Sequence, residues 1–165
     1  MGCYRTILVA LDGSPDAEAA LRHGVALARD QHARLILLTV VPPCPPQMVT
    51  PGGVTPSRAD HEAAFREILR NGVDLLPPDV GVEWRVAHGR PAPRILETAE
   101  ACGCDLIVMG FHGHGRLHRA LAGSVSGDVL RQSRLPVLLM RGSEPRLSSA
   151  EQSQDAAAES HTAAS

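Results

Sequence analysis

The chain has 165 residues, a length typical of one domain with a well-buried core. Its 16 basic and 18 acidic residues give a formal net charge of −2, which excludes the strong positive bias of a nucleic-acid-binding protein. All of its basic residues are arginine, and the absence of lysine excludes a Schiff-base lysine, a lysine general base and a lysine-containing phosphate loop.

The N-terminal sequence gives no signal for a membrane. Arg5 and Asp12 interrupt its apolar stretch, so we expect no signal peptide, and no apolar run reaches about 18 residues. Met1, Gly2 and Thr6 fit the spacing of N-myristoylation, but the strand predicted from Arg5 leaves almost no free arm for it. We therefore expect a cytoplasmic protein with reduced thiols and no membrane partner.

The first apolar run predicts a buried strand followed by a helix. Arg5–Leu11 is continuously apolar after its first residues, and Asp12-Gly13-Ser14-Pro15 then supplies a turn, an N-cap hydroxyl and a first-turn proline. A helix of period 3.6 follows to about Asp30.

The same reasoning predicts, in chain order, a strand at Leu35–Val41, a proline-rich loop at 42–57, a helix at Ala59–Leu76, a strand at Val82–Ala87, a helix at Pro91–Cys102, a strand at Asp105–Met109, a helix at Val125–Gln132 and a strand at Pro136–Met140.

Alternating strands and helices predict an α/β fold with one open parallel sheet and helices on both faces, because right-handed crossovers return each helix to the sheet. Residues 1–143 are predicted to form this Rossmann-like domain. From Glu144 the composition turns to Ser, Ala, Gln and Glu, so we predict that 144–165 are a disordered tail.

A glycine-rich stretch follows the strand predicted at Asp105–Met109. Gly110 and Gly113 are followed, after nine residues, by Gly123-Ser124 at the start of a helix. Glycine allows backbone amides to approach a ligand, and a helix N-terminus with a hydroxyl attracts an anion, so the stretch suits phosphate. Glycine-rich loops also serve as plain turns. The position favours a site, because ligands of open parallel sheets bind at the carboxyl ends of strands, where Asp12 and Gly110 lie.

Three segments resemble the universal stress protein family: Ile7–Ser14, Asp105–Gly113, and Gly123–Ser126 together with Leu135–Leu138. The resemblance covers residues 4–141 and points to the ATP-binding branch of that family. It implies a five-stranded sheet of order 3-2-1-4-5 with ATP lying across strands 1 and 4. The residues that it implies for ATP are Ala10, Asp12, Val40, Met109, Gly110, Gly113, Gly123, Ser124 and Val125, with Asp12 near the ribose or a phosphate-bound Mg²⁺.

Other interpretations of these residues remain open at this stage. Asp12 before Gly-Ser-Pro also fits a turn or helix cap. Arg116 and Arg119 could contact phosphates or face solvent, and a metal site could use the histidines of the glycine-rich stretch, although no Cys or carboxylate lies within the same loop. A redox role for Cys102 and Cys104 has no further support.

We expect a nucleotide-dependent regulatory protein that needs no covalent chemistry. The alternatives are a slow Mg²⁺-dependent ATPase or phosphotransferase, for which Asp12 and His112 are the only candidate groups, and a protein-interaction module without nucleotide. The family resemblance also implies a homodimer through the last strand, 136–141, which should lie at a sheet edge. The sequence leaves open the client protein and the choice among ATP, ADP, AMP and cyclic nucleotides.

Overall fold

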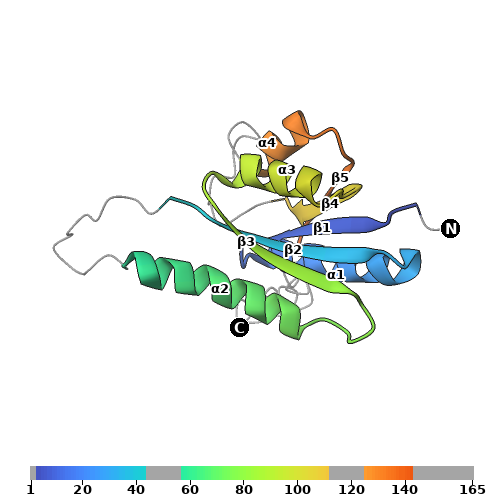
Figure 1. Cartoon of the computed structure of the whole chain (residues 1–165), viewed down its shortest axis with the longest axis horizontal. Coiled ribbons are helices and arrows are strands. Elements are labelled where there is room, and N and C mark those ends of the chain that lie inside the picture. Colours follow the sequence, from blue (N-terminus) through green and yellow to red (C-terminus); the bar gives the residue numbers. More distant parts are fainter. Residues whose placement is uncertain (1–2, 44–56, 112–124, 143–165) are drawn as a thin grey trace, which may run out of the picture.

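A computed structural model describes residues 3–43, 57–111 and 125–142 of the chain. Strands and helices alternate through these residues (Figure 1), which confirms the predicted α/β order. The strands are β1 (Thr6–Leu11), β2 (Arg34–Val41), β3 (Val82–His88), β4 (Leu106–Gly110) and β5 (Val137–Met140), and the helices are α1 (Pro15–Gln31), α2 (Arg58–Asp74), α3 (Pro91–Ala101) and α4 (Val125–Gln132).

The strands form one parallel five-stranded sheet in the order β3-β2-β1-β4-β5. This is the order that the family resemblance implied. β1 lies at the centre, where Ile7 pairs with Leu35 of β2 on one side and with Leu106 of β4 on the other. The chain moves outward from β1 in one direction through β2 and β3, and in the other through β4 and β5.

Successive side chains of β1 point to opposite faces of the sheet and enter two separate cores. Ile7 and Val9 pack in a cluster with Leu21 of α1 and Leu69 of α2. Leu8 packs in a second cluster with residues of α3 and α4. Helices thus cover both faces, and Figure 1 shows α3 and α4 on the side of the sheet opposite to α2.

The central strands are apolar along most of their length because both of their faces are covered. Ile7, Leu8, Val9, Ile107 and Val108 have no exposed surface. Burial of each such side chain stabilises the fold by about 1.5–3 kcal/mol. β3 and β5 lie at the two edges of the sheet, and all four side chains of β5 are only half-buried.

Two serines begin helices as side-chain caps. Ser14 Oγ accepts a hydrogen bond from the backbone N of Ala17 at 3.1 Å, with Pro15 as the first residue of α1. Ser57 Oγ accepts a hydrogen bond from the backbone N of Asp60 at 3.2 Å, and the Asp60 carboxylate accepts one from the backbone N of Ser57 at 3.1 Å. The first cap was predicted from the Ser14-Pro15 pair, whereas the second was not.

Several element bounds differ slightly from the predicted ones. β1 begins at Thr6 rather than Arg5, and the backbone N atoms of both residues donate to the Asp105 carboxylate, at 2.8 Å from Arg5 and 3.2 Å from Thr6. α2 ends at Asp74 rather than Leu76, since the prolines that follow disfavour helical conformation in the residue before them. β5 begins at Val137 because Pro136 has no N–H, although its carbonyl accepts from Ile107 N at 3.0 Å.

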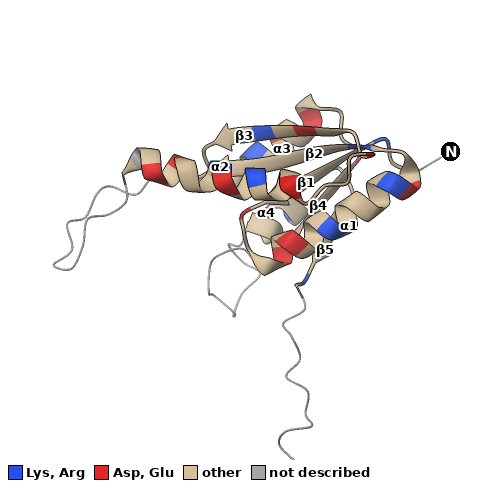
Figure 2. Ribbon diagram, turned by 90° about the horizontal axis from the view of Figure 1, so that it is seen from below, with Lys and Arg blue, Asp and Glu red and all other residues tan. Residues whose placement is uncertain are grey.

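Both acidic and basic residues lie along α1 and α2 (Figure 2). On each helix they form an i,i+4 pair: Glu18 with Arg22 at 2.5 Å and Glu62 with Arg66 at 2.8 Å. Such exposed pairs contribute little stability, about 0.3–0.5 kcal/mol each. Among the described helices, none is long and apolar enough to cross a membrane.

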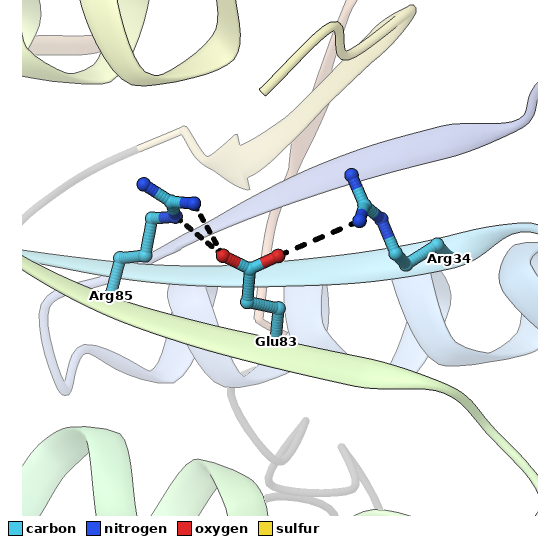
Figure 3. A network of polar contacts seen from close by, with 3 residues as sticks. All are labelled: Arg34, Glu83 and Arg85. Carbon is cyan, nitrogen blue, oxygen red and sulfur yellow. Dashed lines mark hydrogen bonds and ion pairs between the residues drawn. The ribbon is translucent and has the colours of Figure 1, made fainter. Parts of the chain in front are cut away.

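The edge strand β3 carries a network of charged side chains. Glu83 lies between Arg34 and Arg85 (Figure 3), at 2.8 Å from Arg85 Nε and 3.6 Å from an Arg34 guanidinium nitrogen. The hydrogen bond with Glu83 raises the pKa of Arg85. Charged side chains on an edge strand disfavour pairing with another chain, so this edge is protected.

Candidate functional site

The carboxyl ends of β1 and β4 lie side by side, at the point where the two directions of strand order meet. Their pairing ends at Val9↔Val108, before β1 ends at Leu11 and β4 at Gly110. Pairing between β1 and β2 continues to Leu11↔Thr39, and that between β4 and β5 to Gly110↔Met140. The β1–β4 ladder therefore ends before either strand does. We call this switch point between the two strand ends the crevice, because open α/β folds bind their ligands at such a place.

Asp12 follows β1 at one side of this crevice and is half-buried. Its Oδ1 accepts a hydrogen bond from the Ser14 backbone N at 2.9 Å, and Gly13 between them has a φ of 80°. This is an Asx-type turn, so Asp12 has the turn role that the sequence left open. A carboxylate has a second oxygen and several acceptor positions, so the turn is compatible with a ligand at the same residue.

Gly110 lies at the other side of the crevice and packs against the first turn of α1. A Cβ at this position would lie 2.9 Å from the Ala17 backbone N and 2.9 Å from the Asp16 carbonyl carbon. The sequence suggested a glycine that allows a ligand to approach. The structure gives Gly110 a packing reason, because any larger side chain would push α1 away.

Three of the predicted site residues share one face of the sheet. Val40 of β2 and Met109 of β4 belong to the core cluster under α3 and α4, and Ala10 of β1 packs against it. Val40 and Met109 are nearly buried, with 7% and 5% of their surface exposed, and Ala10 is half-buried. Because β2 continues past the last pair with β1, Val40 lies beyond the end of that ladder.

A buried threonine forms a hydrogen bond with the last residue of β1, and the sequence analysis did not identify it. Thr39 Oγ1 donates to the Leu11 carbonyl at 2.6 Å, and Thr39 has no exposed surface. The hydroxyl is thereby a side-chain donor to the carbonyl at the end of β1, beside the crevice. A threonine inside the otherwise aliphatic run LILLTVV was the available signal.

Ser126 is a second residue that the sequence analysis gave no role. Its Oγ donates to the Phe111 carbonyl at 2.7 Å, and the Phe111 backbone N donates to the Met140 carbonyl at 2.7 Å. Ser126 is buried in the first turn of α4. The hydrogen bond fastens the N-terminal end of α4 to the residue that follows β4. Val125, the first residue of α4, is 36% exposed beside it.

The remaining predicted residues lie outside the described part of the chain. Gly113, Gly123 and Ser124 fall in residues 112–124, as do the histidines and arginines of that stretch. Their roles stay predictions. In the described part, no group of three or more His, Cys, Asp or Glu side chains is arranged to hold a metal ion.

The two cysteines after α3 lie away from the crevice, at the amino end of β4. Cys104 is buried, and burial raises the pKa of its thiol to about 12, with the negative charges of Cys102 and Asp105 as smaller causes. A thiol that stays protonated is a poor nucleophile. A redox role for Cys104 is therefore unsupported, and both residues are free cysteines.

The family model described as the universal stress protein family matches residues 3–141, which include every described strand and helix. The chain belongs to the universal stress protein family. The resemblance found in the sequence is thus confirmed.

Curated universal stress proteins match this one over most of their length. The protein YxiE of Bacillus subtilis is 33% identical over 151 residues, covering 84% of this chain and 99% of its own. The protein MJ0531 of Methanocaldococcus jannaschii is 30% identical over 146 residues, covering 84% and 82%.

Solved structures of universal stress proteins have the same fold. A family member from Burkholderia pseudomallei is 32% identical with a TM-score of 0.62, covering 83% of this chain and 96% of its own. A universal stress protein crystallised in complex with cAMP is 28% identical with a TM-score of 0.65, covering 85% and 98%.

Proposed function

We propose that this universal stress protein is a regulatory protein of the ATP-binding branch, and that it binds ATP with Mg²⁺ in the crevice between β1 and β4. The observation that carries the proposal is the early end of the β1–β4 ladder at Val9↔Val108. It leaves the ends of β1 and β4 unpaired with each other at the switch point, whereas β1 stays paired with β2 through Leu11 and β4 with β5 through Gly110. Nucleotides of open parallel sheets bind at such a switch point, beyond the carboxyl ends of the strands.

The phosphates are proposed to bind at the N-terminal end of α4. Ser126 holds this end beside Phe111 and hence beside the crevice. A helix N-terminus carries roughly half a positive charge, so it attracts phosphate without the lysine that this chain lacks. Gly110, Gly113, Gly123, Ser124 and Val125 are the residues proposed to line the phosphate path.

The base and ribose are proposed to lie against the sheet face that α3 and α4 cover. Ala10 and Met109 would form the walls, and the backbone of Val40 would meet the adenine, since Val40 lies beyond the β1–β2 ladder. A related protein of 28% identity was solved in complex with cAMP, which also contains adenine. This relative supports an adenine nucleotide and leaves the number of phosphates to experiment.

The residues present fit a Mg²⁺ ion that is held mainly by phosphate. Asp12 is the one predicted carboxylate at the crevice, and the described part has no cluster that could hold a metal alone. Mg²⁺ commonly keeps several waters and binds through one or two carboxylates together with substrate phosphates. When bound, the ion would neutralise phosphate charge beside Asp12.

Calorimetric titration with ATP and Mg²⁺ tests the site. The wild-type chain should bind, and Ser126→Ala should raise the Kd about 2–10-fold, because the lost hydrogen bond frees the end of α4. Ser133→Ala is the matched control, since Ser133 Oγ contacts the Leu135 carbonyl at 2.8 Å at the other end of α4. No binding at millimolar ATP, or an unchanged Kd in Ser126→Ala, would refute the site assignment.

Asp12→Asn tests the proposed ion. The amide oxygen can still accept from the Ser14 backbone N, so the turn is kept while the charge is lost. We expect the variant to bind ATP equally well in EDTA and in Mg²⁺, whereas the wild type binds more tightly with Mg²⁺. An equal Mg²⁺ effect in the two proteins would remove Asp12 from the ion site.

We also propose a homodimer that forms through β5, in the cytoplasm. β5 is an apolar edge strand, Val137–Met140, whose side chains are all half-buried, whereas the other edge carries the charges of Glu83 and Arg85. Unprotected apolar edges pair with other chains. Sedimentation should give the mass of a dimer at micromolar concentration, and a monomer throughout would contradict this assembly.

A further inference from the structure

The three residues Met140–Gly142 at the end of β5, here called the β5 exit, contact both sides of the crevice. The ladder between β1 and β4 ends at Val9↔Val108, so strand pairing does not fix the distance between Asp12 and the end of β4. Other contacts must fix it. The β5 exit supplies two such contacts, one with Phe111 and one with the first turn of α1.

The first contact holds Phe111 by its backbone and its ring. The Phe111 backbone N donates to the Met140 carbonyl at 2.7 Å. The Arg141 guanidinium lies over the Phe111 ring, with Cζ 4.4 Å from the ring centroid. This is within the range of a cation–π interaction, for which arginine is the commonest partner. The Phe111 carbonyl accepts a hydrogen bond from Ser126 of α4, so the residue whose ring lies under Arg141 also contacts α4.

The second contact holds the start of α1. The Gly142 backbone N donates to Asp16 Oδ1 at 2.6 Å. A Cβ on Gly142 would lie 2.8 Å from the carbonyl carbon and oxygen of Pro15, so the two backbones touch. The turn from Asp12 to Ser14 leads directly into this part of α1.

We infer that the β5 exit is a positioning element of the nucleotide site, in which Arg141 orients Phe111 and Gly142 holds the first turn of α1. The inference rests on the proposed function. Arg141 acts on the nucleotide through Phe111 and the end of α4, and Gly142 acts through Asp16 and the Asp12 turn. The last strand of the sheet, whose outer edge is the proposed dimer contact, thereby bears on nucleotide affinity.

The test is a double-mutant cycle between Phe111 and Arg141, read as the Kd for ATP with Mg²⁺ at a temperature where all variants are folded. Arg141→Ala and Phe111→Leu should each raise the Kd about 2–5-fold, the range of an exposed cation–π interaction. The double variant should be no weaker than either single variant, because one contact is lost in all three. Arg141→Lys should restore most of the affinity, since it keeps the cation.

Arg66→Ala is the matched control, because Arg66 forms an exposed ion pair with Glu62 on α2 and should leave the Kd unchanged. If the wild type binds and both single variants bind equally tightly, the inference is wrong and the proposed function stands. Effects that add in the double variant, or no rescue by lysine, also overturn it. If the wild type does not bind ATP, the proposed function itself fails.

Discussion

Gly110 ends β4 in a space that leaves no room for a side chain. Its missing Cβ would contact the backbone of Asp16 and Ala17 at 2.9 Å, a distance that real Cβ atoms do not adopt. The residue therefore sets how closely α1 approaches the sheet. Since α1 begins three residues after Asp12, this packing also fixes one side of the crevice.

Gly110→Ala should lower the free energy of unfolding by about 1–3 kcal/mol, because the added methyl group overpacks a backbone contact. Urea unfolding followed by far-ultraviolet circular dichroism measures it. Trp84 is a poor reporter because it is already 60% exposed in the folded chain. Gly81→Ala is the control, since a Cβ there meets nothing within 4 Å. Equal stabilities of the two variants would contradict the packing role.

Cys104 should make the stability of the fold depend on alkaline pH. Burial raises the pKa of its thiol to about 12 in the folded chain, whereas a thiol in an unfolded chain ionises near about 8.5. Between these values the unfolded chain binds fewer protons, so the free energy of unfolding falls as the pH rises. The contribution of the thiol to the free energy of unfolding is fully present below the unfolded pKa of about 8.5.

Urea unfolding of the wild type and of Cys104→Ala, at several pH values from neutral to strongly alkaline, isolates the effect. The difference in stability between the two proteins should shrink as the pH rises. A constant difference would show that the thiol titrates alike in both states.

Helix α1 depends on a cap that lies inside the protein. Ser14 is 5% exposed, and its Oγ accepts from the Ala17 backbone N in a buried hydrogen bond. The capping box of α2, at Ser57 and Asp60, is exposed to solvent. If the serine hydroxyl is removed, water can hydrogen-bond to the backbone N–H that is left at α2 but cannot reach the one at α1. The two caps should therefore differ in their effect on stability.

Ser14→Ala should destabilise the chain by about 1–2 kcal/mol, at the upper end of the range for N-caps, and Ser57→Ala by about 0.5–1 kcal/mol. The two variants are compared by urea unfolding at neutral pH. If Ser57→Ala lowered the free energy of unfolding more than Ser14→Ala, burial would not determine how much these caps contribute to stability.

At the scale of the whole molecule, the fold is a parallel sheet with a core on each face. The β1, β2 and β4 strands carry nearly all of the fully buried side chains, whereas the residues of edge strand β3 are half-buried or exposed and those of edge strand β5 are half-buried. Within the described residues, which end at Gly142, the last members of the two clusters are Leu139 and Met140 of β5.

A chain that ends at Ser143 should therefore keep the stability of the full chain within about 0.5 kcal/mol, the usual range for surface changes. The sequence after it is rich in Ser, Ala, Gln and Glu, with little apolar surface to bury. Thermal unfolding of the two chains, followed by circular dichroism, measures the difference. A markedly less stable shortened chain would contradict a disordered tail.

The sequence by itself determined the order of strands and helices, because continuous apolar runs and 3.6-residue periods reflect burial that each segment undergoes in any parallel α/β fold. It also indicated Asp12 and Gly110 as residues at strand ends, and the family resemblance supplied the sheet order. The predicted end of α2 and the predicted start of β5 differed by one or two residues, because a proline disrupts the helix or strand pattern there.

Only the tertiary structure decided how those ends meet. The early end of the β1–β4 ladder, the Thr39 and Ser126 hydroxyls on strand-end carbonyls, and the contact of Arg141 with Phe111 all join residues far apart in the chain. No local pattern encodes them, because each depends on the position of one strand beside another. The switch point likewise exists only in the assembled sheet, because the chain leaves β1 toward β2 and β3 on one side and leaves β4 toward β5 on the other.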